Sequence, residues 1–204
     1  MWGLVIYDNS KINIMNWSNT NYVIEGNSND LEEIKNVLEE VSSLKWPILI
    51  DILKKLNINV ERSNSVRGYL IPPVDYSDGV IKLFAREAWG VSDFADYLKE
   101  KYPSLKCYFE SYDFSIGLFE TNDINHKYFK NIYVANYADY EKKDYEDAVL
   151  FTSEESLFKW LSEKINKEIK TKEDFEKIDF SSYNDYNHSL SVEPIRYFNS
   201  NLLD

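Results

Sequence analysis

The fold is decided by residues 22–41, which read YVIEGNSNDLEEIKNVLEEV. The aromatic and β-branched side chains at 22–24 predict a strand, and the glycine and asparagine that follow predict a turn. Asn29 then stands at an N-cap position with Glu32 three residues later, which is the spacing of a capping box. Behind it, apolar side chains recur at helical intervals between outward-facing acids. They are Leu31, Ile34, Leu38 and Val41. A strand followed by an amphipathic helix therefore opens the folded region.

The next elements alternate between helix and strand. Pro47 suits the first turn of a helix over 48–56, for which we expect an apolar face. That face comprises Ile48, Ile52, Leu53 and Leu56. Residues 57–79 contain prolines and predict a loop with one possible strand at 68–71. A strand over 80–85 and a helix over 93–101 follow. Ser92 is the expected cap of that helix, and Pro103 follows its end.

Two alternating strands come next. Leu105, Cys107 and Phe109 share one face of the first strand, and Phe114, Ile116 and Leu118 share one face of the second. The residues at 111–113 predict the turn between them. Residues 132–137 predict another strand.

The C-terminal part of the chain predicts one strong helix. Residues 139–147 form an acidic, tyrosine-bearing loop in this interpretation. Thr152 and Glu155 then have capping-box spacing, and apolar residues recur at helical intervals behind them. They are Leu157, Leu161, Ile165 and Ile169. A helical turn at 171–178 follows, and the residues after 178 are mostly polar.

The order of elements predicts the fold class. Between residues 16 and 120 it contains strand, helix, two strands, helix and strand, which is the ferredoxin-like split βαβ arrangement. We expect an α+β protein with an antiparallel sheet, helices on one face, and a C-terminal α/β extension. The predicted domains are 1–137, with an insertion at 43–79, and 138–204, with a helix over 153–169 and a polar tail. The β-prone runs 4–7 and 12–15 predict a hairpin before this region.

Several short motifs resemble a known family. Asn16-Trp17-Ser18-Asn19, a strand ending in Gly26, and a helix resemble the opening of the YubB-type ferredoxin-like family of plasmid and phage proteins. The second half of the family pattern is similar to a later part of this chain. That part comprises Ala88-Trp89, a helix ending in Tyr102-Pro103, then Tyr112 and Gly117-Leu118-Phe119. Two features depart from the family pattern. About 15 residues precede the Asn-Trp element, and Gly90-Val91 replaces Ser-Pro-Pro. The resemblance implies a ferredoxin-like fold and a mobile-element setting, for a family without an established catalytic activity.

Composition excludes several classes of protein. The chain has 35 acidic and 23 basic residues, a net charge of −12, which argues against a nucleic-acid-backbone binder. Its one cysteine excludes an intramolecular disulfide and a multi-cysteine zinc site, and its six glycines match no nucleotide-binding loop. We therefore expect no cofactor and no direct contact with nucleic acid. The first residues lack a signal-peptide pattern and no apolar run is long enough to span a bilayer, so we expect a cytoplasmic protein without a membrane partner.

Few residues suit catalysis. Cys107 alternates with apolar neighbours, which indicates a buried and inert thiol. His126 lies in a polar loop and His188 in the polar C-terminal part, and neither pattern indicates a general base. The candidate acids are three carboxylates around the predicted hairpin, which could serve acid–base or divalent-cation chemistry. They are Glu110, Asp113 and Glu120. Clusters of this kind are also expected by chance in an acidic chain.

The best candidate for a binding surface is the acidic, tyrosine-bearing stretch. Tyrosine is enriched at interaction hot spots, and interspersed carboxylates would steer a basic partner. The predicted partner-binding residues are Tyr137, Asp139, Tyr140, Glu141, Asp144, Tyr145, Glu146 and Asp147. A weaker candidate follows in Tyr183, Asp185 and Tyr186. The alternative interpretation of both stretches is that each is an ordinary solvated segment with no binding role.

Three functions remain open at this stage. The first is a non-enzymatic acidic protein that masks a basic partner: a nuclease toxin, for an immunity protein, or a host defence nuclease, for an inhibitor. The second is a carboxylate or divalent-cation-dependent enzyme centred on the Glu110–Glu120 hairpin. The third is a sheet that binds RNA through aromatic side chains, which ranks last because the predicted strands carry few basic residues. We expect the first.

Overall fold

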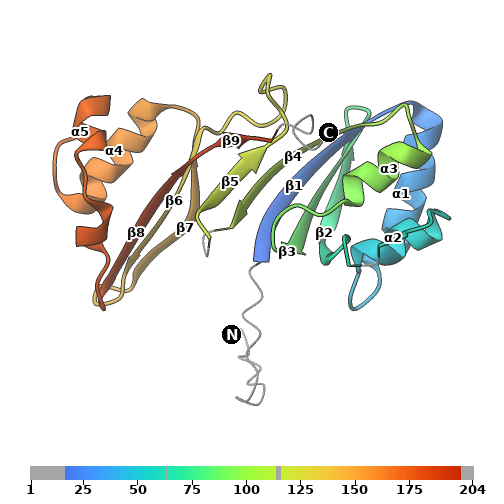
Figure 1. Cartoon of the computed structure of the whole chain (residues 1–204), viewed down its shortest axis with the longest axis horizontal. Coiled ribbons are helices and arrows are strands. Elements are labelled where there is room, and N and C mark those ends of the chain that lie inside the picture. Colours follow the sequence, from blue (N-terminus) through green and yellow to red (C-terminus); the bar gives the residue numbers. More distant parts are fainter. Residues whose placement is uncertain (1–16, 63, 114–115, 199–204) are drawn as a thin grey trace, which may run out of the picture.

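The computed structural model describes residues 17–62, 64–113 and 116–198. The described chain forms two lobes that lie side by side along the long axis of the molecule (Figure 1). The larger lobe contains a six-stranded sheet and three helices, and the smaller lobe contains a three-stranded sheet with its own helices. The mixed architecture confirms the expected α+β class. The hairpin predicted at 4–7 and 12–15 lies outside the described residues.

The larger sheet is antiparallel except at one edge. Its strand order is β2-β3-β1-β4-β5-β9, and only β5 and β9 run parallel. The strands are β1 (Trp17–Glu25), β2 (Gly68–Ser77), β3 (Val80–Ala88), β4 (Lys106–Asp113), β5 (Leu118–Thr121) and β9 (Arg196–Tyr197). The helices are α1 (Ser28–Ser42), α2 (Leu49–Lys55) and α3 (Phe94–Lys101).

The helices of the larger lobe pack on one face of its sheet. Tyr22 lies opposite Leu83 on one neighbouring strand and Phe109 on the other, so these three side chains share a face. All three belong to the main hydrophobic core, together with the buried residues of the helices. Those helix residues are Leu31, Ile34, Leu38, Val41, Leu49, Ile52, Leu53, Phe94, Ala95 and Leu98. The opposite face of β1, β2 and β3 therefore lies away from the helices.

The smaller lobe has a separate core. Its sheet has the order β7-β6-β8, formed by β6 (Tyr133–Asp139), β7 (Asp144–Phe151) and β8 (His188–Pro194). The helices α4 (Glu154–Ile165) and α5 (Lys172–Glu176) and the 3-10 helix η1 (Phe180–Tyr183) complete the lobe. Leu157 and Leu161 of α4 pack against Ala135 and Leu190 of the sheet in this second core.

The segment of β8 and β9 joins the two lobes. β8 pairs with β6 in the smaller sheet, and after one intervening residue β9 pairs with β5 in the larger sheet (Figure 1). The amide of Ile195 donates to the carbonyl oxygen of Ile132 at 2.9 Å, and that of Phe198 donates to Thr121 at 2.7 Å. The Phe198 ring packs edge-on against Phe109, with centroids 5.8 Å apart.

The periodic helices follow the sequence prediction with small shifts at their ends. The buried residues of α1 are the predicted ones, but Asn27 rather than Asn29 is the N-cap, because the Asn27 side chain accepts from the amide of Asp30 at 3.0 Å. The cap of α4 is likewise Ser153 instead of Thr152. Ile169 is buried, although α4 ends before it at a left-handed Asn166.

Two predictions near α2 and β2 are wrong. Ile48 was expected in the core and is 41% exposed, whereas Leu49 is fully buried. The possible strand predicted at 68–71 is the first part of β2, but the loop predicted for 72–77 is wrong, since β2 continues through the cis Pro72-Pro73 pair to Ser77. β2 tolerates these prolines because it is an edge strand with an irregularity between Ile71 and Asp75.

The β4–β5 hairpin is shifted along the chain. Residues 111–113, predicted as the turn, belong to β4, and Phe119 rather than Leu118 is the fully buried residue of β5. Strand side chains alternate between faces, so a displacement of one residue exchanges the buried and exposed sets. Phe114 lies outside the described residues.

The acidic stretch and the C-terminal part contain more regular structure than expected. The loop predicted over 139–147 is a tight hairpin, since β7 begins at Asp144. The sequence assigned no strand after residue 178, where β8 and β9 lie. The predicted division into domains 1–137 and 138–204 stays a prediction. Among the described helices, none combines the length and apolar character needed to cross a bilayer.

Candidate partner-binding site

The hairpin between β6 and β7 presents two exposed aromatic side chains. Tyr140 is 52% and Tyr145 is 57% exposed, and their rings meet edge to face with centroids 5.7 Å apart. Because each ring supports the other, neither has the full rotamer freedom of an isolated surface tyrosine. The pair therefore forms a defined apolar feature on a polar surface.

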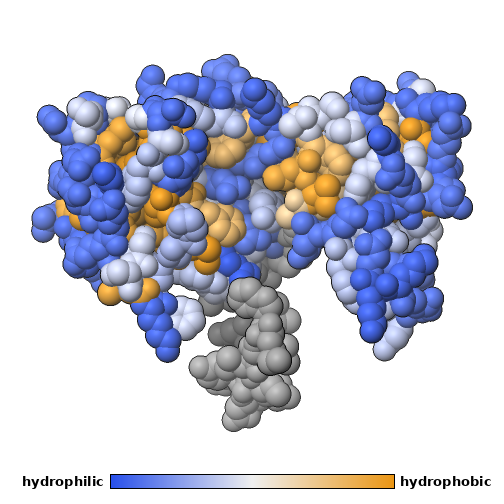
Figure 2. Space-filling view, turned by 180° about the vertical axis from the view of Figure 1, so that it is seen from behind, coloured by the Kyte–Doolittle hydropathy of each residue, from blue (hydrophilic) through white to orange (hydrophobic). Residues whose placement is uncertain are grey.

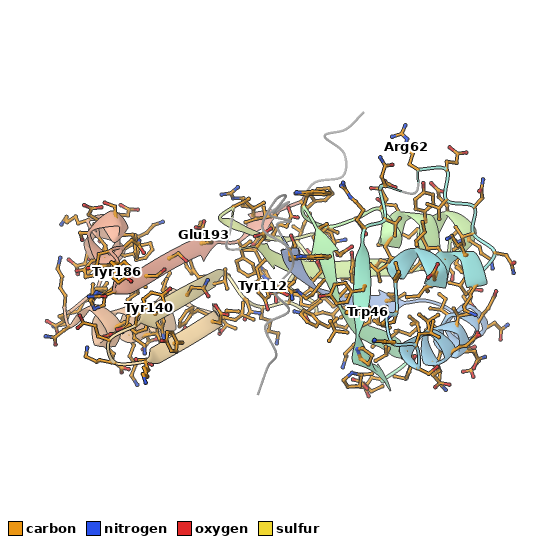
Figure 3. The ribbon with its side chains drawn as sticks, turned by 90° about the horizontal axis from the view of Figure 1, so that it is seen from below. Trp46, Arg62, Tyr112, Tyr140, Tyr186 and Glu193 are labelled. Carbon is orange, nitrogen blue, oxygen red and sulfur yellow. The ribbon has the colours of Figure 1, made fainter. Side chains whose placement is uncertain are left out.

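A second segment brings another tyrosine to the same end of the lobe. The amide of Tyr140 donates to the carbonyl oxygen of Asn187 at 2.8 Å, and the Asn187 side chain donates to Glu141 at 2.7 Å. Tyr186, next to Asn187, is 96% exposed. Tyr140 and Tyr186 both lie at the outer end of the smaller lobe (Figure 3). We refer to Tyr140, Tyr145 and Tyr186 as the tyrosine tip.

Two carboxylates of the hairpin are paired within the protein. Lys164 of α4 forms ion pairs with Asp144, at 3.1 Å, and with Glu146. The indole nitrogen of Trp160 also donates to Glu146 at 2.7 Å. The ammonium group of Lys164 and this hydrogen bond lower the pKa of Glu146. β7 is therefore tied to α4 by charged and polar contacts, which hold the hairpin in one position.

Asp139 closes the turn of the hairpin. Its carboxylate is 1% exposed and accepts from the amide and from the ammonium group of Lys142, at 2.9 and 2.8 Å. These hydrogen bonds lower the pKa of Asp139. His188 of β8 lies 3.8 Å away, with its other ring nitrogen 3.0 Å from Asp185. Asp139 thus stabilises the hairpin and is not a freely accessible charge.

The predicted binding residues therefore have different positions. Tyr137 is half-buried against Trp160, with Lys164 4.5 Å above its ring, so it supports the hairpin from inside. Tyr140, Tyr145, Glu141 and Asp147 are exposed. The sequence indicated this stretch as an acidic, tyrosine-bearing loop, but it could not distinguish the supporting residues from the accessible ones.

The alternative carboxylate site is not assembled. In the paired strands, Glu110 lies opposite Thr121, whereas Ser111 lies opposite Glu120. Cross-strand partners share a face and neighbours alternate, so Glu110 is on one face of the sheet and Glu120, with Asp113, is on the other. Burial raises the pKa of both glutamates. Within the described ranges, no three His, Cys, Asp or Glu side chains are grouped to hold a metal ion.

The most buried carboxylate is one that the sequence did not indicate. Glu87 of β3 is fully buried and accepts hydrogen bonds from the Tyr22 hydroxyl at 2.8 Å, from the Ser92 amide at 3.1 Å and from the Ser92 hydroxyl. Burial raises its pKa, and the hydrogen bonds oppose that shift. The residues that surround Glu87 in the sequence do not indicate its burial, because its hydrogen-bond partners come from β1 and from the turn after β3.

Cysteine and histidine are the residue types best suited to nucleophilic or acid–base chemistry, and Cys107 and His126 both take part in the packing of the fold. Cys107 is buried as predicted, and desolvation raises the pKa of its thiol to about 12. His126, expected in a solvated loop, contacts the carbonyl oxygen of Phe129 at 2.9 Å and the hydroxyl of Tyr197 at 2.8 Å. It therefore bridges the loop before β6 to β9.

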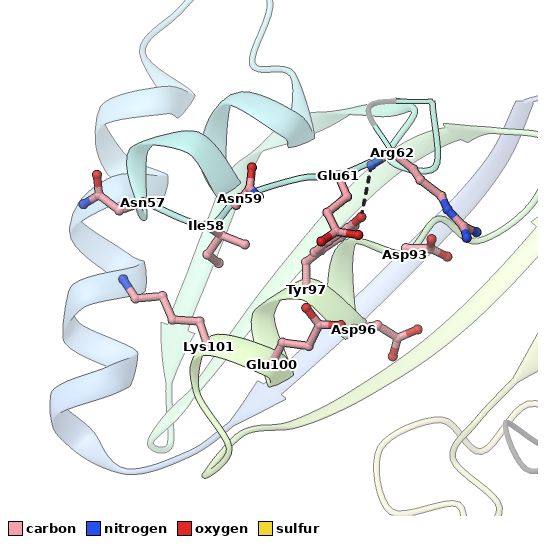
Figure 4. Close-up of a pocket in the computed structure, with 10 residues that line it drawn as sticks. All are labelled: Asn57, Ile58, Asn59, Glu61, Arg62, Asp93, Asp96, Tyr97, Glu100 and Lys101. Carbon is pink, nitrogen blue, oxygen red and sulfur yellow. Dashed lines mark hydrogen bonds between the residues drawn. The ribbon is translucent and has the colours of Figure 1, made fainter.

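A polar groove of about 700 Å³ lies between the segment after α2 and helix α3 (Figure 4). The main-chain amide of Arg62 donates to the Tyr97 hydroxyl at 3.5 Å across it. Its lining residues are Asn57, Ile58, Asn59, Glu61, Arg62, Asp93, Asp96, Tyr97, Glu100 and Lys101. Most of these side chains are exposed, so the groove is an acidic area of the outer surface.

The larger lobe has exposed aromatic residues as well. Trp46 is 65% exposed, and Trp89 is 52% exposed with the Arg67 guanidinium 4.4 Å above its ring. No family model, curated protein or solved structure matches the chain. Function must therefore be argued from the surfaces themselves.

The tyrosine tip is the surface on which the sequence and the geometry agree best. The sequence singled out the hairpin and ranked Tyr186 lower, because the two segments are far apart in the chain. Only the pairing of β6 with β8 brings them together. A periodic strand signal in residues 188–194 would have indicated this pairing, but the stretch HSLSVEP alternates too weakly to predict it.

Proposed function

We propose that this chain is a non-enzymatic binding protein that recognises a basic protein through the tyrosine tip. The observation that carries the proposal is the exposure of Tyr140, Tyr145 and Tyr186 together at the end of the smaller lobe. Tyrosine supplies large contact area and a polar group at a low entropic cost, which makes it frequent in binding hot spots.

The rigidity of the hairpin supports this role. Lys164 holds β7 against α4, and Asp139 closes the turn, so the tyrosines are positioned before any partner arrives. A preorganised surface loses less conformational entropy on binding. The intramolecular ion pairs also mean that the contact energy would come mainly from the tyrosine rings, with only part from the carboxylates.

The charge of the chain supports a basic partner. The net charge of −12 attracts cationic proteins over distances comparable to the Debye length and raises their association rate. A nuclease is a suitable partner of this kind, because its substrate-binding surface is basic. The chain would then be an immunity protein if the nuclease is a toxin, or an inhibitor if it belongs to a host defence system.

We also propose that β1 to β4 with α1 and α3 form a ferredoxin-like unit, as in the YubB-type family. The antiparallel order β2-β3-β1-β4 and the chain order strand, helix, strand, strand, helix, strand support it. This assignment would place the chain in a plasmid or phage setting. It leaves the smaller lobe as the part that carries the tyrosine tip.

Affinity capture tests the proposed function. The tagged full chain is incubated with lysate of its own host at low salt and eluted with a salt step, beside a Tyr140→Ala/Tyr145→Ala variant. Trp46→Ala, which removes an equally exposed ring from the larger lobe, is the matched control. We expect a basic protein to elute from the unmodified chain and the control but not from the tip variant.

Kinetics with the purified partner complete the test. The association rate should fall steeply between about 50 and 500 mM salt, because screening shortens the range of the attraction. Equal capture by the tip variant, or an association rate that ignores salt, would refute the proposal. The identity of the captured protein, a toxin or a defence nuclease, would distinguish an immunity protein from an inhibitor.

A further inference from the structure

One face of the larger sheet is not covered by α1, α2 or α3. The helices pack on the face that carries Tyr22 and Leu83, so the alternate residues of β1, β2 and β3 point the other way. Figure 2, seen from behind relative to Figure 1, shows that the surface of the larger lobe combines apolar patches with hydrophilic areas, and of the residues named next only Phe84 is apolar on the scale of that figure. We call six residues of this surface the open face. They are Trp17, Asn19, Asn21, Tyr69, Phe84 and Arg86.

Strand register arranges these residues in rows across the sheet. Arg86 on β3 lies opposite Tyr69 on β2 and opposite Asn19 on β1. The next row places Phe84 opposite Asn21. Rings, a guanidinium and two amides thus alternate on neighbouring strands, and each of the six side chains is half-buried.

Arg86, the arginine of the open face, has no ion-pair partner among the described residues. The guanidinium of Arg86 forms no ion pair or hydrogen bond with any described residue, and it lies 5.7 Å from the centre of the Trp17 ring. Trp17 meets Tyr69 edge to face, with centroids 5.4 Å apart. The face therefore offers a cation between aromatic rings, a combination that suits an anion attached to a flat apolar group.

Two carboxylates near the open face have partners within the protein. Glu110, opposite Asn21, is buried and accepts from the Asn131 side chain at 2.9 Å. Asp75 pairs with Lys82 at 3.6 Å. The open face therefore combines the Arg86 guanidinium with the buried carboxyl group of Glu110.

We propose that the open face binds single-stranded nucleic acid. Bases would stack on Trp17 and Phe84, the Asn19 and Asn21 amides would bond to base edges, and Arg86 would contact a phosphate. This proposal does not rest on the tyrosine tip, which is on the other lobe. It replaces the sequence-based expectation of no contact with nucleic acid. That expectation followed from the net charge of the chain, because the sequence alone does not show where the basic residues lie on the fold.

Because the open face has several aromatic rings but few basic residues, its affinity for a single strand should depend only weakly on salt concentration. Arg86 is in the open face, and Arg67, the residue before β2, has its guanidinium 4.4 Å from the centre of the Trp89 ring. Each neutralised phosphate on a single strand contributes a slope of about −0.7 to a plot of log affinity against log salt. Two contacts would give a slope of about −1.4. Binding through stacking therefore survives moderate salt, whereas capture of a basic protein does not.

Fluorescence anisotropy tests the proposal on the full chain. The probes are labelled oligo(U) and oligo(dT) of about 12 nucleotides, within the usual length of a single-strand site, and a duplex of the same length. We expect both oligo(U) and oligo(dT) to bind with the small salt slope. One of the two should bind more tightly, because the first contains ribose and the second deoxyribose. The duplex should bind much more weakly than either. Trp17→Leu, which keeps apolar bulk but removes the ring, should lower the affinity roughly tenfold or more.

Arg86→Gln gives a second readout that does not depend on core packing. It should weaken binding and reduce the salt slope by about 0.7. The tip variant Tyr140→Ala/Tyr145→Ala is the matched control and should bind the strands normally, so failure here is distinct from failure of the proposed function. Absence of binding, equal binding of the duplex, or unchanged affinity in both open-face variants would overturn the proposal. Self-association lost on Arg86→Gln would also overturn it, since the face would then bind a second copy.

Discussion

The buried hydrogen bond between Tyr22 and Glu87 contributes to the stability of the larger lobe. We predict that Tyr22→Phe, which removes only the hydroxyl, costs about 1.5–3 kcal/mol at neutral pH, the range for a hydrogen bond to a charged group. The ring remains packed between Phe94 and Phe109, at centroid distances of 6.0 and 6.3 Å, so no cavity is added. For a chain of 204 residues this corresponds to a fall in Tm of about 3–12 °C.

The cost should depend on pH in a defined direction. Burial raises the pKa of Glu87 in the folded chain, and the hydrogen bond from Tyr22 opposes that shift. A raised carboxyl pKa means that stability is greatest below the unfolded value, about 4.3, and is lost as pH rises through the folded value. Tyr22→Phe raises the folded pKa further. Its cost is therefore smaller near the unfolded pKa and larger at neutral pH.

Denaturant unfolding followed by circular dichroism, at neutral pH and at about pH 4.5, measures both quantities. Tyr140→Phe is the matched control, because it removes an exposed hydroxyl and should leave the free energy of unfolding unchanged. A double-mutant cycle with Glu87→Gln isolates the pair. Equal costs at the two pH values, or no coupling in the cycle, would refute this account of the contact.

Three further predictions concern the cores and the sheet. The Cys107 thiol, whose pKa burial raises to about 12, should react with a thiol reagent near pH 8 only after denaturation; rapid labelling of the native chain would contradict its burial. Leu161→Ala on α4 should cost about 2–5 kcal/mol in denaturant unfolding, whereas Leu150→Ala on the exposed side of β7 should cost much less. Gly68→Ala should lower Tm by several degrees, since its Cβ would lie 2.6 Å from the Arg86 carbonyl oxygen; an unchanged Tm would show that β2 can move.

Local patterns predicted the helices and the buried thiol well. The apolar spacing of α1 and α4 identifies their buried faces, because helix periodicity depends only on neighbours within two turns. Cys107 followed from alternation along β4 in the same way. These features are encoded within short segments, so the sequence is sufficient for them.

Features that depend on distant strands could not be predicted. β2 continues through Pro72 because, among the described residues, its outer side makes only an isolated bridge from Tyr69 to Ile48 and no strand pairs there, and edge position is a property of the whole sheet. Tyr140 and Tyr186 lie at the same end of the smaller lobe only because β8 pairs with β6. The open face was missed for the same reason: Arg86 and Trp17 come from separate strands, and their proximity follows from register.

β8 and β9 are the last of the described strands to be synthesised, although they pair with strands that are made much earlier. β5 is the last strand of the larger sheet made before the smaller lobe, and its outer edge is covered by β9. A ribosome therefore releases residues 17–121 long before β9, which pairs with the edge of β5, has been synthesised. During that interval β5 presents an unpaired edge, which is the feature of nascent chains most prone to pair with a wrong neighbour. β9 is thus the strand that closes the larger sheet only after the smaller lobe has been made, and any product that stops before residue 196 would keep that edge open.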